Sequence, residues 1–185
     1  MDVGEAKKRL RSEVLRRLAE IRPSQRALEE ELVTGAIQGT PEWKAARLVL
    51  LYRDLPGEFS TVGLANAAWR LDKRVAMPRV AGPGKLALHE VGAWTDLRPG
   101  AFGLQEPPAS LPRVEPEAID LAIVPGVAWT HDGRRLGRGG GYYDRLVPSL
   151  RLPWGVGFDV QVMASLPLEA HDVPVARLWT AAAVR

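Results

Sequence analysis

Short apolar segments alternate with helix-like segments along most of this chain, and this alternation constrains the fold more than any other feature. Each apolar segment is short and bounded by polar, proline or glycine residues, which is typical of a buried strand. Strands are predicted at 46–52, 74–80, 85–91, 118–126, 154–158 and 173–180. Helices are predicted at 5–21, 24–37, 61–71 and 142–150. Strands that alternate with helices predict an α/β fold with a mostly parallel sheet covered on both faces.

The first two helices are separated by a proline. Leu10, Val14 and Leu18 recur at helical spacing in the first helix, and Pro23 is expected to end it. Ser24 then offers a side-chain oxygen that would cap the second helix. Later stretches rich in proline and glycine are read as excursions within one domain, 1–185.

Charge and residue content exclude several function classes. Lys plus Arg number 25 against 22 Asp plus Glu, so the net charge is only +3 and gives little support for nucleic-acid binding. There is no cysteine, which excludes disulfides, thiolate metal sites and cysteine nucleophiles. No apolar run approaches the roughly 20 residues of a membrane span, and residues 1–20 are highly charged where a signal peptide would be apolar. We therefore expect a cytoplasmic protein that binds neither nucleic acid nor membrane.

The segment RRLGRGGGYYDRL, residues 134–146, is the leading candidate for a functional loop. It comes after the predicted strand at 118–126, and ligands of such sheets bind where loops leave the carboxyl ends of strands. The glycines at 139–141 would permit positive φ and let backbone N–H groups approach an anion just before a helix. Arg135 and Arg138 add planar cations that suit phosphate oxygens. The loop therefore predicts a phosphate site.

Two common phosphate-binding patterns are absent from this loop. A P-loop would end in Gly-Lys-Ser/Thr, and the dinucleotide pattern G-x-G-x-x-G fails because position 142 is Tyr142. The alternative is a flexible hairpin tip, in which three glycines would be ordinary. We favour the phosphate site because arginines, an aromatic pair and a carboxylate share the same short segment.

The residues also match a known family. The segment PGVAWTHDGRRLGRGGGYYDR, residues 125–145, closely resembles the signature of 5-formyltetrahydrofolate cyclo-ligase, also called methenyltetrahydrofolate synthetase. Other segments resemble the family in the same order: KKRLR (7–11), LYRDLPGEFST (51–61), MPRV (77–80), LRPGAFGLQEP (97–107) and LPLEAHDVPV (166–175). The resemblance covers nearly the whole chain.

The resemblance implies a three-layer α/β/α fold in a single cyclo-ligase domain, and we expect a monomer. It also implies a ligase of folate one-carbon metabolism that uses ATP and Mg²⁺. Such an enzyme converts 5-formyltetrahydrofolate into 5,10-methenyltetrahydrofolate, ADP and phosphate. Phosphorylation of the formyl oxygen would give an iminium phosphate, which N10 of the folate attacks while phosphate leaves. The protein would mainly align two ligands and neutralise the charge that passes between them.

The resemblance assigns the site residues as well. Arg138 is the expected catalytic residue between the γ-phosphate and the formyl oxygen, where a rigid cation can follow the moving charge. The expected ATP-binding residues are Lys7, Lys8, Arg9, Leu10, Arg11, Arg135, Leu136, Gly137, Arg138, Gly139, Gly140, Gly141, Tyr142 and Tyr143. The expected folate-binding residues are Glu58, Arg138, Gly139, Gly140, Gly141 and Tyr142, and the expected magnesium ligands are Asp144 and Asp172.

Several of these residues also have a plainer interpretation. Lys7 and Arg11 share one helix face because they are four residues apart. A basic helix face of this kind is often exposed to solvent and binds no ligand. The two tyrosines would also suit ordinary packing at a helix start. Glu58 suits the N–H donors of a pterin, but outside the family context it reads as a loop glutamate. His171, beside a predicted metal ligand, is interpreted as structural.

Two positions depart from the family pattern. Members of the family usually carry aspartate where this chain has Thr130 and Ala176. This leaves an alternative function, a catalytically weak relative that binds reduced folate or nucleotide as a sensor. An RNA-binding module using the basic N-terminal helix is a second alternative. The small net charge and the lack of an interleaved basic–aromatic sheet pattern count against it.

Overall fold

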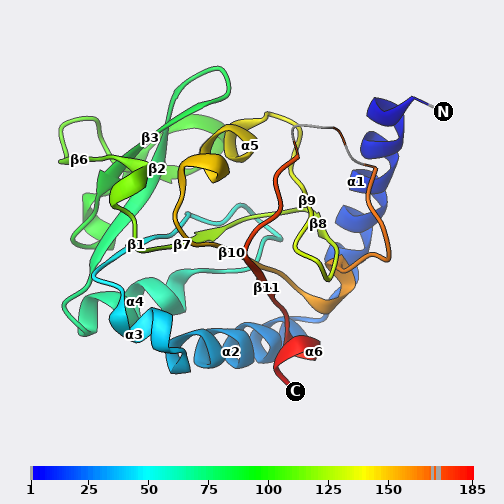
Figure 1. The fold of residues 1–185 in the computed structure, drawn as a ribbon, viewed down its shortest axis with the longest axis horizontal. Coiled ribbons are helices and arrows are strands. Elements are labelled where there is room, and N and C mark those ends of the chain that lie inside the picture. Colours follow the sequence, from blue (N-terminus) through cyan, green and yellow to red (C-terminus); the bar gives the residue numbers. More distant parts are fainter. Residues whose placement is uncertain (1, 168, 170–171) are drawn as a thin grey trace.

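The computed structural model describes residues 2–167, 169 and 172–185. A seven-stranded mixed sheet runs through the molecule in the order β11-β10-β7-β1-β2-β3-β6 (Figure 1). Its strands are β1 (Leu48–Leu50), β2 (Arg74–Gly82), β3 (Lys85–Glu90), β6 (Arg113–Val114), β7 (Leu121–Val124), β10 (Pro153–Val156) and β11 (Arg177–Trp179). The pairs from β11 to β2 are parallel, and β3 and β6 join antiparallel at one edge. The predicted mostly parallel sheet is confirmed.

Helices cover both faces of this sheet, so the predicted three layers are present. The lower layer in Figure 1 contains α2 (Pro23–Gly39), α3 (Pro41–Ala45) and α4 (Val62–Arg70). On the opposite face lie the short helix α5 (Tyr142–Leu146) and the 3₁₀ turn η4 (Val147–Ser149). The helices α1 (Val3–Glu20) and α6 (Ala181–Val184) lie toward one end of the sheet.

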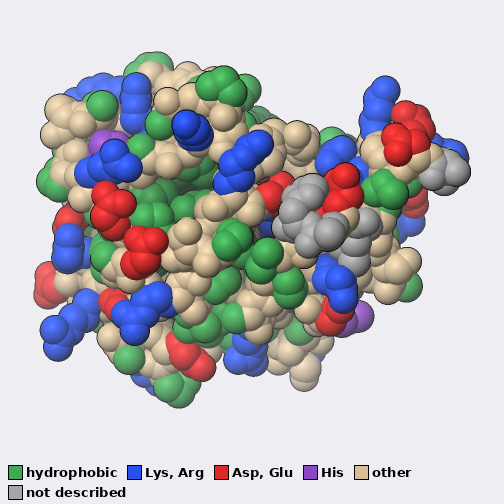
Figure 2. All heavy atoms as spheres, turned by 45° about the horizontal axis from the view of Figure 1, so that its top comes forward, with side chains coloured by type: hydrophobic (Ala, Val, Ile, Leu, Met, Phe, Trp, Pro, Cys, Tyr) green, Lys and Arg blue, Asp and Glu red, His purple; other side chains and the backbone are tan. Residues whose placement is uncertain are grey.

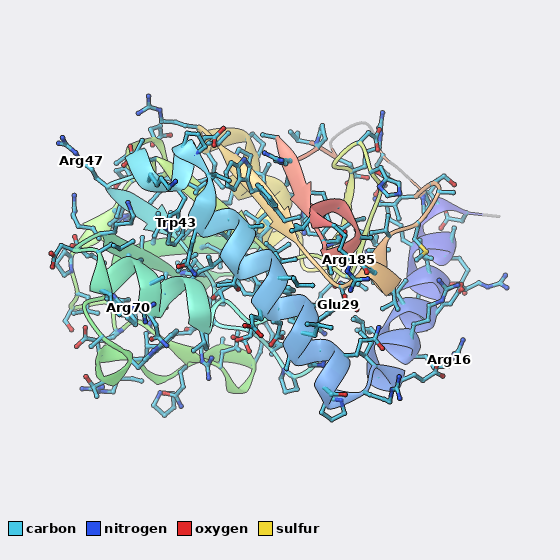
Figure 3. All side chains as sticks on the ribbon, turned by 90° about the horizontal axis from the view of Figure 1, so that it is seen from below. Arg16, Glu29, Trp43, Arg47, Arg70 and Arg185 are labelled. Carbon is cyan, nitrogen blue, oxygen red and sulfur yellow. The ribbon has the colours of Figure 1, made fainter. Side chains whose placement is uncertain are left out.

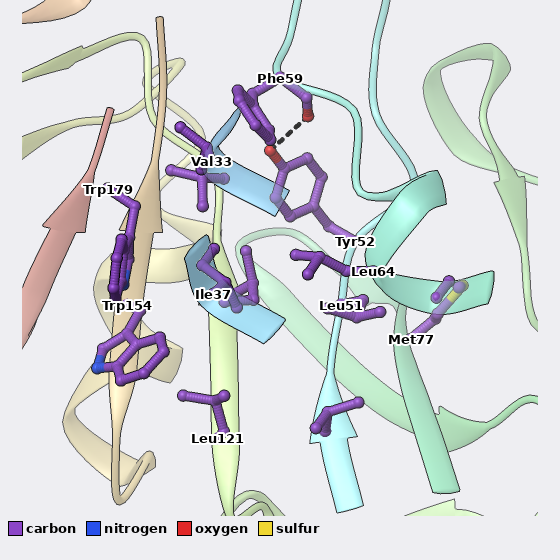
Figure 4. Packing of buried hydrophobic residues seen from close by; sticks show 14 of the residues in the cluster. Val33, Ile37, Leu51, Tyr52, Phe59, Leu64, Met77, Leu121, Trp154 and Trp179 are labelled. Atoms are coloured by element: carbon purple, nitrogen blue, oxygen red, sulfur yellow. Dashed lines mark hydrogen bonds between the residues drawn. The ribbon is translucent and has the colours of Figure 1, made fainter. Parts of the chain in front are cut away.

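Alternation along the strands produces two cores. Val49 and Leu51 pack toward the α2 layer, whereas Leu48 and Leu50 pack toward α5, because successive side chains point to opposite faces. All four side chains are buried, which explains why β1 reads as a continuous apolar run. Figure 4 shows the α2-side core, in which Ile37 lies among residues from the strands. Seen from that side in Figure 3, α2 crosses the sheet diagonally.

The helix boundary near Pro23 differs from the prediction. Pro23 is the first residue of α2, and Arg22 is the N-cap without a side-chain capping bond, so the predicted Ser24 cap is wrong. Proline fits the first helical position because its fixed φ is already helical and its missing N–H would have no partner there. Several strand ends also differ, since 118–126 contributes only Leu121–Val124 and 173–180 only Arg177–Trp179, whereas the strand predicted at 74–80 extends to Gly82.

The remaining strands form two small ribbons beside the main sheet. One pairs β4 (Arg98–Pro99) with β5 (Gln105–Glu106), and the other pairs β8 (Ala128–Trp129) with β9 (Arg135–Leu136). The second ribbon ends where the glycine loop begins. Among the described residues, no helix combines the length and apolar character needed to cross a membrane.

Candidate active site

A cavity of about 440 Å³ lies at the carboxyl ends of the central strands, on the α5 side of the sheet. Strand order explains its position: β1 pairs in parallel with both β2 and β7, so the loops that follow β1 and β7 start at the same edge. Figure 2 shows a hollow with hydrophobic side chains inside and Lys or Arg side chains near its rim. The lining residues come from the loop after β1, the β2–β3 hairpin, the 102–106 segment and residues 125–144.

The glycine loop forms one wall of this cavity. Gly139 and Gly141 have φ of +100° and +68°, so the left-handed conformation predicted for this loop is confirmed at these two positions. Gly140 is not in that region, so the prediction is wrong for it. A Cβ at Gly140 would instead lie 2.7 Å from the ring of Tyr142, which a side chain there would displace.

The backbone N–H groups of this loop are available to a ligand. Within the part of the chain that the structure describes, those of residues 138–141 donate to no protein acceptor. Because α5 spans only five residues, its dipole adds little, and the loop backbone itself is the candidate anion cradle.

Arg138 and Glu58, predicted as catalytic and folate-binding residues, meet in the cavity. Arg138 Nε donates to Glu58 Oε1 at 2.7 Å, although the residues are 80 positions apart. The other carboxylate oxygen accepts from the backbone N–H of Leu55 at 2.9 Å. The Glu58 side chain is only 12% exposed and that of Arg138 is 39% exposed. The carboxylate is therefore fixed to its own turn, and the arginine is the more exposed partner.

Arg135 is buried beneath the loop. Its guanidinium donates to a carboxylate oxygen of Asp144 and, at 3.3 Å, to the carbonyl of Pro125. Burial lowers the pKa of Arg135 from its ordinary value, and the negative charge of Asp144 opposes that shift, so the group remains a cation. Burial, together with the charge of Glu58, raises the pKa of Tyr143. Its phenol is therefore neutral at physiological pH.

The N-terminal helix approaches the glycine loop with the predicted face. Arg11 Nε donates to the carbonyl of Gly137 at 2.7 Å. Lys7 Nζ lies 2.7 Å from Glu169 Oε2 and 2.8 Å from Asp172 Oδ2. Burial lowers the pKa of Lys7, but the hydrogen bonds and charges of Asp172 and Glu169 outweigh it and the net pKa is raised. Neither Lys7 nor Arg11 lines the cavity.

Four other predicted ATP-binding residues lie on the solvent-exposed face of α1 or in the hydrophobic core. Lys8 and Arg9 are exposed on α1, and Leu10 packs against the core. Leu136 is also a core residue, with 3% exposure. The side chains of Leu10 and Leu136 are committed to packing, Leu10 lies inside α1, and the carbonyl of Leu136 accepts from the N–H of Val127 at 2.8 Å, so the structure gives neither residue a group directed at a nucleotide.

The predicted magnesium ligands both contact cations in the protein. Asp144 pairs with Arg135, and Asp172 pairs with Lys7. The charges of both aspartates act on Arg135. Among the described residues no group of three or more His, Cys, Asp or Glu side chains could hold a metal ion. A divalent cation here would need phosphate or water oxygens to complete its shell, which agrees with the reluctance of Mg²⁺ to lose its waters.

Known proteins resemble this chain in sequence and in fold. The sequence model of the 5-formyltetrahydrofolate cyclo-ligase family matches residues 3–181. The chain belongs to this family. The 5-formyltetrahydrofolate cyclo-ligase of Haemophilus influenzae is 30% identical over 176 residues, 91% of this chain and 94% of that protein.

Solved structures of similar proteins share the fold of this cyclo-ligase. The 5,10-methenyltetrahydrofolate synthetase of Aquifex aeolicus superposes with a TM-score of 0.84 at 36% identity, covering 94% of this chain and 88% of the other. The synthetase of Mycoplasma pneumoniae gives 0.77 at 18% identity, covering 95% and 98%, and supports the fold alone. The chain is therefore an enzyme, a ligase of folate one-carbon metabolism.

Sequence reasoning missed one wall of the cyclo-ligase cavity. Phe102, Gln105 and Glu106 line it, and Phe102 packs edge-on against Tyr142 with ring centroids 6.1 Å apart. Phe102 is 68% exposed and has φ of +57°, which is unusual for a residue that is not glycine. The segment 97–107 was part of the resemblance, but nothing in its spacing showed that it turns back over the glycine loop.

The two departures from the family pattern have defined local contacts. Thr130 is buried, and its hydroxyl donates to a carboxylate oxygen of Asp132 and accepts from the backbone N–H of Arg134 at 3.2 Å. Thr130 therefore holds the turn between β8 and β9 together with Asp132, although position 130 itself carries no carboxylate. Ala176 is exposed, and its N–H donates to the carbonyl of Pro153 at 2.8 Å. His171 lies outside the described residues.

Proposed function

We propose that this chain catalyses the ATP- and Mg²⁺-dependent conversion of 5-formyltetrahydrofolate into 5,10-methenyltetrahydrofolate, ADP and phosphate. The observation that carries the proposal is the meeting of Arg138 with Glu58 in a cavity walled by the glycine loop. The same cavity then offers the backbone N–H groups of the glycine loop to an anion and the fixed carboxylate of Glu58 to a ring with N–H donors. Because both half-sites lie at one edge of one sheet, a single domain suffices for the reaction.

The nucleotide half of the proposed site is built from the glycine loop. Its free N–H groups at 138–141 would receive phosphate oxygens, and Arg138 would add the mobile cation. Arg11 reaches the same loop from α1 and donates to the carbonyl of Gly137, and Lys7, one turn earlier on the helix, is paired with Glu169 and Asp172. Their charges would then act on the outer phosphates.

The donor set beside this loop fits magnesium. Asp144 and Asp172 supply two carboxylates whose charges both act on Arg135, and ATP oxygens and water would supply the remaining ligands. The ion would neutralise phosphate charge during transfer. Asp172 is paired with Lys7 and also accepts from the backbone N–H of Glu169 at 2.8 Å, so nucleotide phosphates that attract Lys7 would weaken this ion pair.

The folate half of the proposed site centres on Glu58. Its carboxylate suits the amino group and ring N–H of a pterin, and the rings of Tyr142 and Phe102 line the same cavity. A folate held there would present its formyl group to Arg138.

The chemistry then proceeds in two displacements. The formyl oxygen attacks the γ-phosphorus, the bond from that phosphorus to the β–γ bridging oxygen breaks, and ADP leaves. N10 next attacks the activated formyl carbon, loses its proton, and phosphate departs with the former formyl oxygen. Arg138 follows the negative charge from one site to the other, and the cavity keeps the two ligands aligned.

A coupled assay tests this proposal. Purified protein with 5-formyltetrahydrofolate, ATP and Mg²⁺ should generate methenyl absorbance, with one ADP formed per product. Omission of ATP or chelation of Mg²⁺ should abolish the signal. Protein that binds both ligands but forms no product would instead support the folate- or nucleotide-sensing alternative.

A further inference from the structure

The ion pair between Arg138 and Glu58 joins two side chains that the proposed reaction assigns to different ligands. Glu58 is required by the pterin, and Arg138 is required by the γ-phosphate. In the structure Arg138 Nε donates to Glu58 Oε1 at 2.7 Å, so each side chain has the other as its partner. We infer that Glu58 is a positioning residue for Arg138, holding it away from the nucleotide until folate binds. This inference rests on the proposed function.

The contacts of the pair determine which partner moves when it opens. Glu58 is held by the N–H of Leu55, and its own N–H donates to the carbonyl of Leu55 at 2.9 Å, so the carboxylate belongs to a closed turn. Arg138 precedes Gly139, whose φ is +100°, on a loop without internal backbone bonds among residues 138–141. Its side chain is also the more exposed of the two. Opening the pair therefore moves Arg138 and leaves Glu58 in place.

Folate binding would open the pair by direct competition. A ring that presents two parallel N–H donors to a carboxylate uses both of its oxygens, as bidentate partners do. Each carboxylate oxygen can accept two donors, so Oε2 can keep the N–H of Leu55 while it binds the pterin, and at Oε1 the pterin competes with the Arg138 guanidinium. A partly exposed ion pair is weak enough to be exchanged in this way.

The consequence is that ATP chemistry depends on folate. Without folate, the unwanted reaction is hydrolysis: a water oxygen attacks the γ-phosphorus, the bond to the β–γ bridging oxygen breaks, and ADP, phosphate and a proton are released. Arg138 would assist this step only if it reached the γ-phosphate. While Glu58 holds it, the transition state lacks that cation and ATP is conserved.

The test uses Glu58→Gln, which keeps the shape of the side chain and removes its charge. In the absence of folate, the variant should hydrolyse ATP about tenfold faster than wild type and bind a non-hydrolysable ATP analogue more tightly. This factor corresponds to an arginine that is free about a tenth of the time in wild type. Glu90→Gln is the matched control, because Glu90 pairs with Arg74 on the β2–β3 hairpin outside the cavity. It should leave both quantities unchanged.

Two further measurements make the inference falsifiable. The double variant Glu58→Gln/Arg138→Gln should fall to the wild-type hydrolysis rate or below it, and a rate that stays high would overturn the inference. Wild-type protein should bind the ATP analogue more tightly when saturated with 5-formyltetrahydrofolate, and an unchanged affinity would also overturn it. Failure of wild type to form methenyl product would overturn the proposed function instead, so the two failures are distinguishable.

Discussion

At the scale of single residues, Arg138 carries the largest share of the proposed chemistry. Arg138→Lys keeps the charge but loses the planar fork that tracks the phosphoryl group. We expect kcat to fall about a hundredfold, equivalent to roughly 3 kcal/mol, with a smaller change in the KM for ATP. Steady-state kinetics with melting as a folding check would measure this, and Arg74→Lys is the control. Near-normal turnover would mean that Arg138 only positions phosphate.

Gly140 tests the geometry of the loop. Gly140→Val should weaken ATP binding at least tenfold, because the new Cβ would lie where the ring of Tyr142 now sits. The reason is this contact and not a left-handed backbone, since Gly140 does not adopt positive φ. Titration with a non-hydrolysable ATP analogue would detect the loss. A companion Gly35→Ala variant, in open space on α2, should bind ATP normally.

At the scale of elements, Arg145 joins the glycine loop to the β2–β3 hairpin. Its Nη1 donates to the carbonyls of Gly84 and Gly141 at 3.2 and 3.1 Å. Arg145→Met should therefore raise the KM for ATP several-fold with a smaller effect on kcat. Gly84→Ala should act similarly, because its Cβ would meet the same guanidinium and because the φ of +65° at this position is strained for alanine. If the effects of the two variants simply add in the double variant, they do not share this contact.

The carboxylate of Asp120 holds the N-terminal end of strand β1. Asp120 Oδ2 accepts from the N–H groups of Leu48 and Arg47, and these bonds hold the pKa of Asp120 below its usual value despite partial burial. A lowered folded pKa stabilises the protein above the unfolded pKa, near 3.9, and the contribution disappears as pH falls through the folded value. Asp120→Asn should cost on the order of 1 kcal/mol at neutral pH. Denaturation from pH 7 to 3 should show the difference shrinking, and a constant difference would contradict the mechanism.

At the scale of the whole molecule, the cavity joins loops that follow β1 and β7 with the β2–β3 hairpin. Ligands that bind only the folded state should therefore stabilise the entire chain. A nucleotide at a hundred times its Kd adds about 2.7 kcal/mol, which corresponds to a rise in Tm of roughly 5–10 °C for this size. ATP with Mg²⁺ should produce this shift in a melting experiment. ATP with a chelator should produce less, and equal shifts would argue against a metal at Asp144 and Asp172.

The sequence by itself determined the layered α/β architecture, because the period of apolar residues is a local property. Residues Leu48 to Leu51 are all apolar because helices cover both faces of the sheet at that strand. The glycine loop was also recognisable, because positive φ at Gly139 and Gly141 requires glycine whatever the surroundings. Element ends were less predictable, as Pro23 and Ser24 show, since several residues there satisfy the same local rule.

Only the tertiary structure decided which side chains meet. Strand order places β7 beside β1, and this brings Arg138 to Glu58 across 80 positions of sequence. It likewise pairs Lys7 with Asp172 and directs Phe102 over the glycine loop. Arg135 and Asp144, which the sequence assigned to phosphate and to metal, are also paired with each other in the wall of the cavity. A charge in a folded protein takes the partner that the packing brings within reach, and spacing along the chain does not encode that distance.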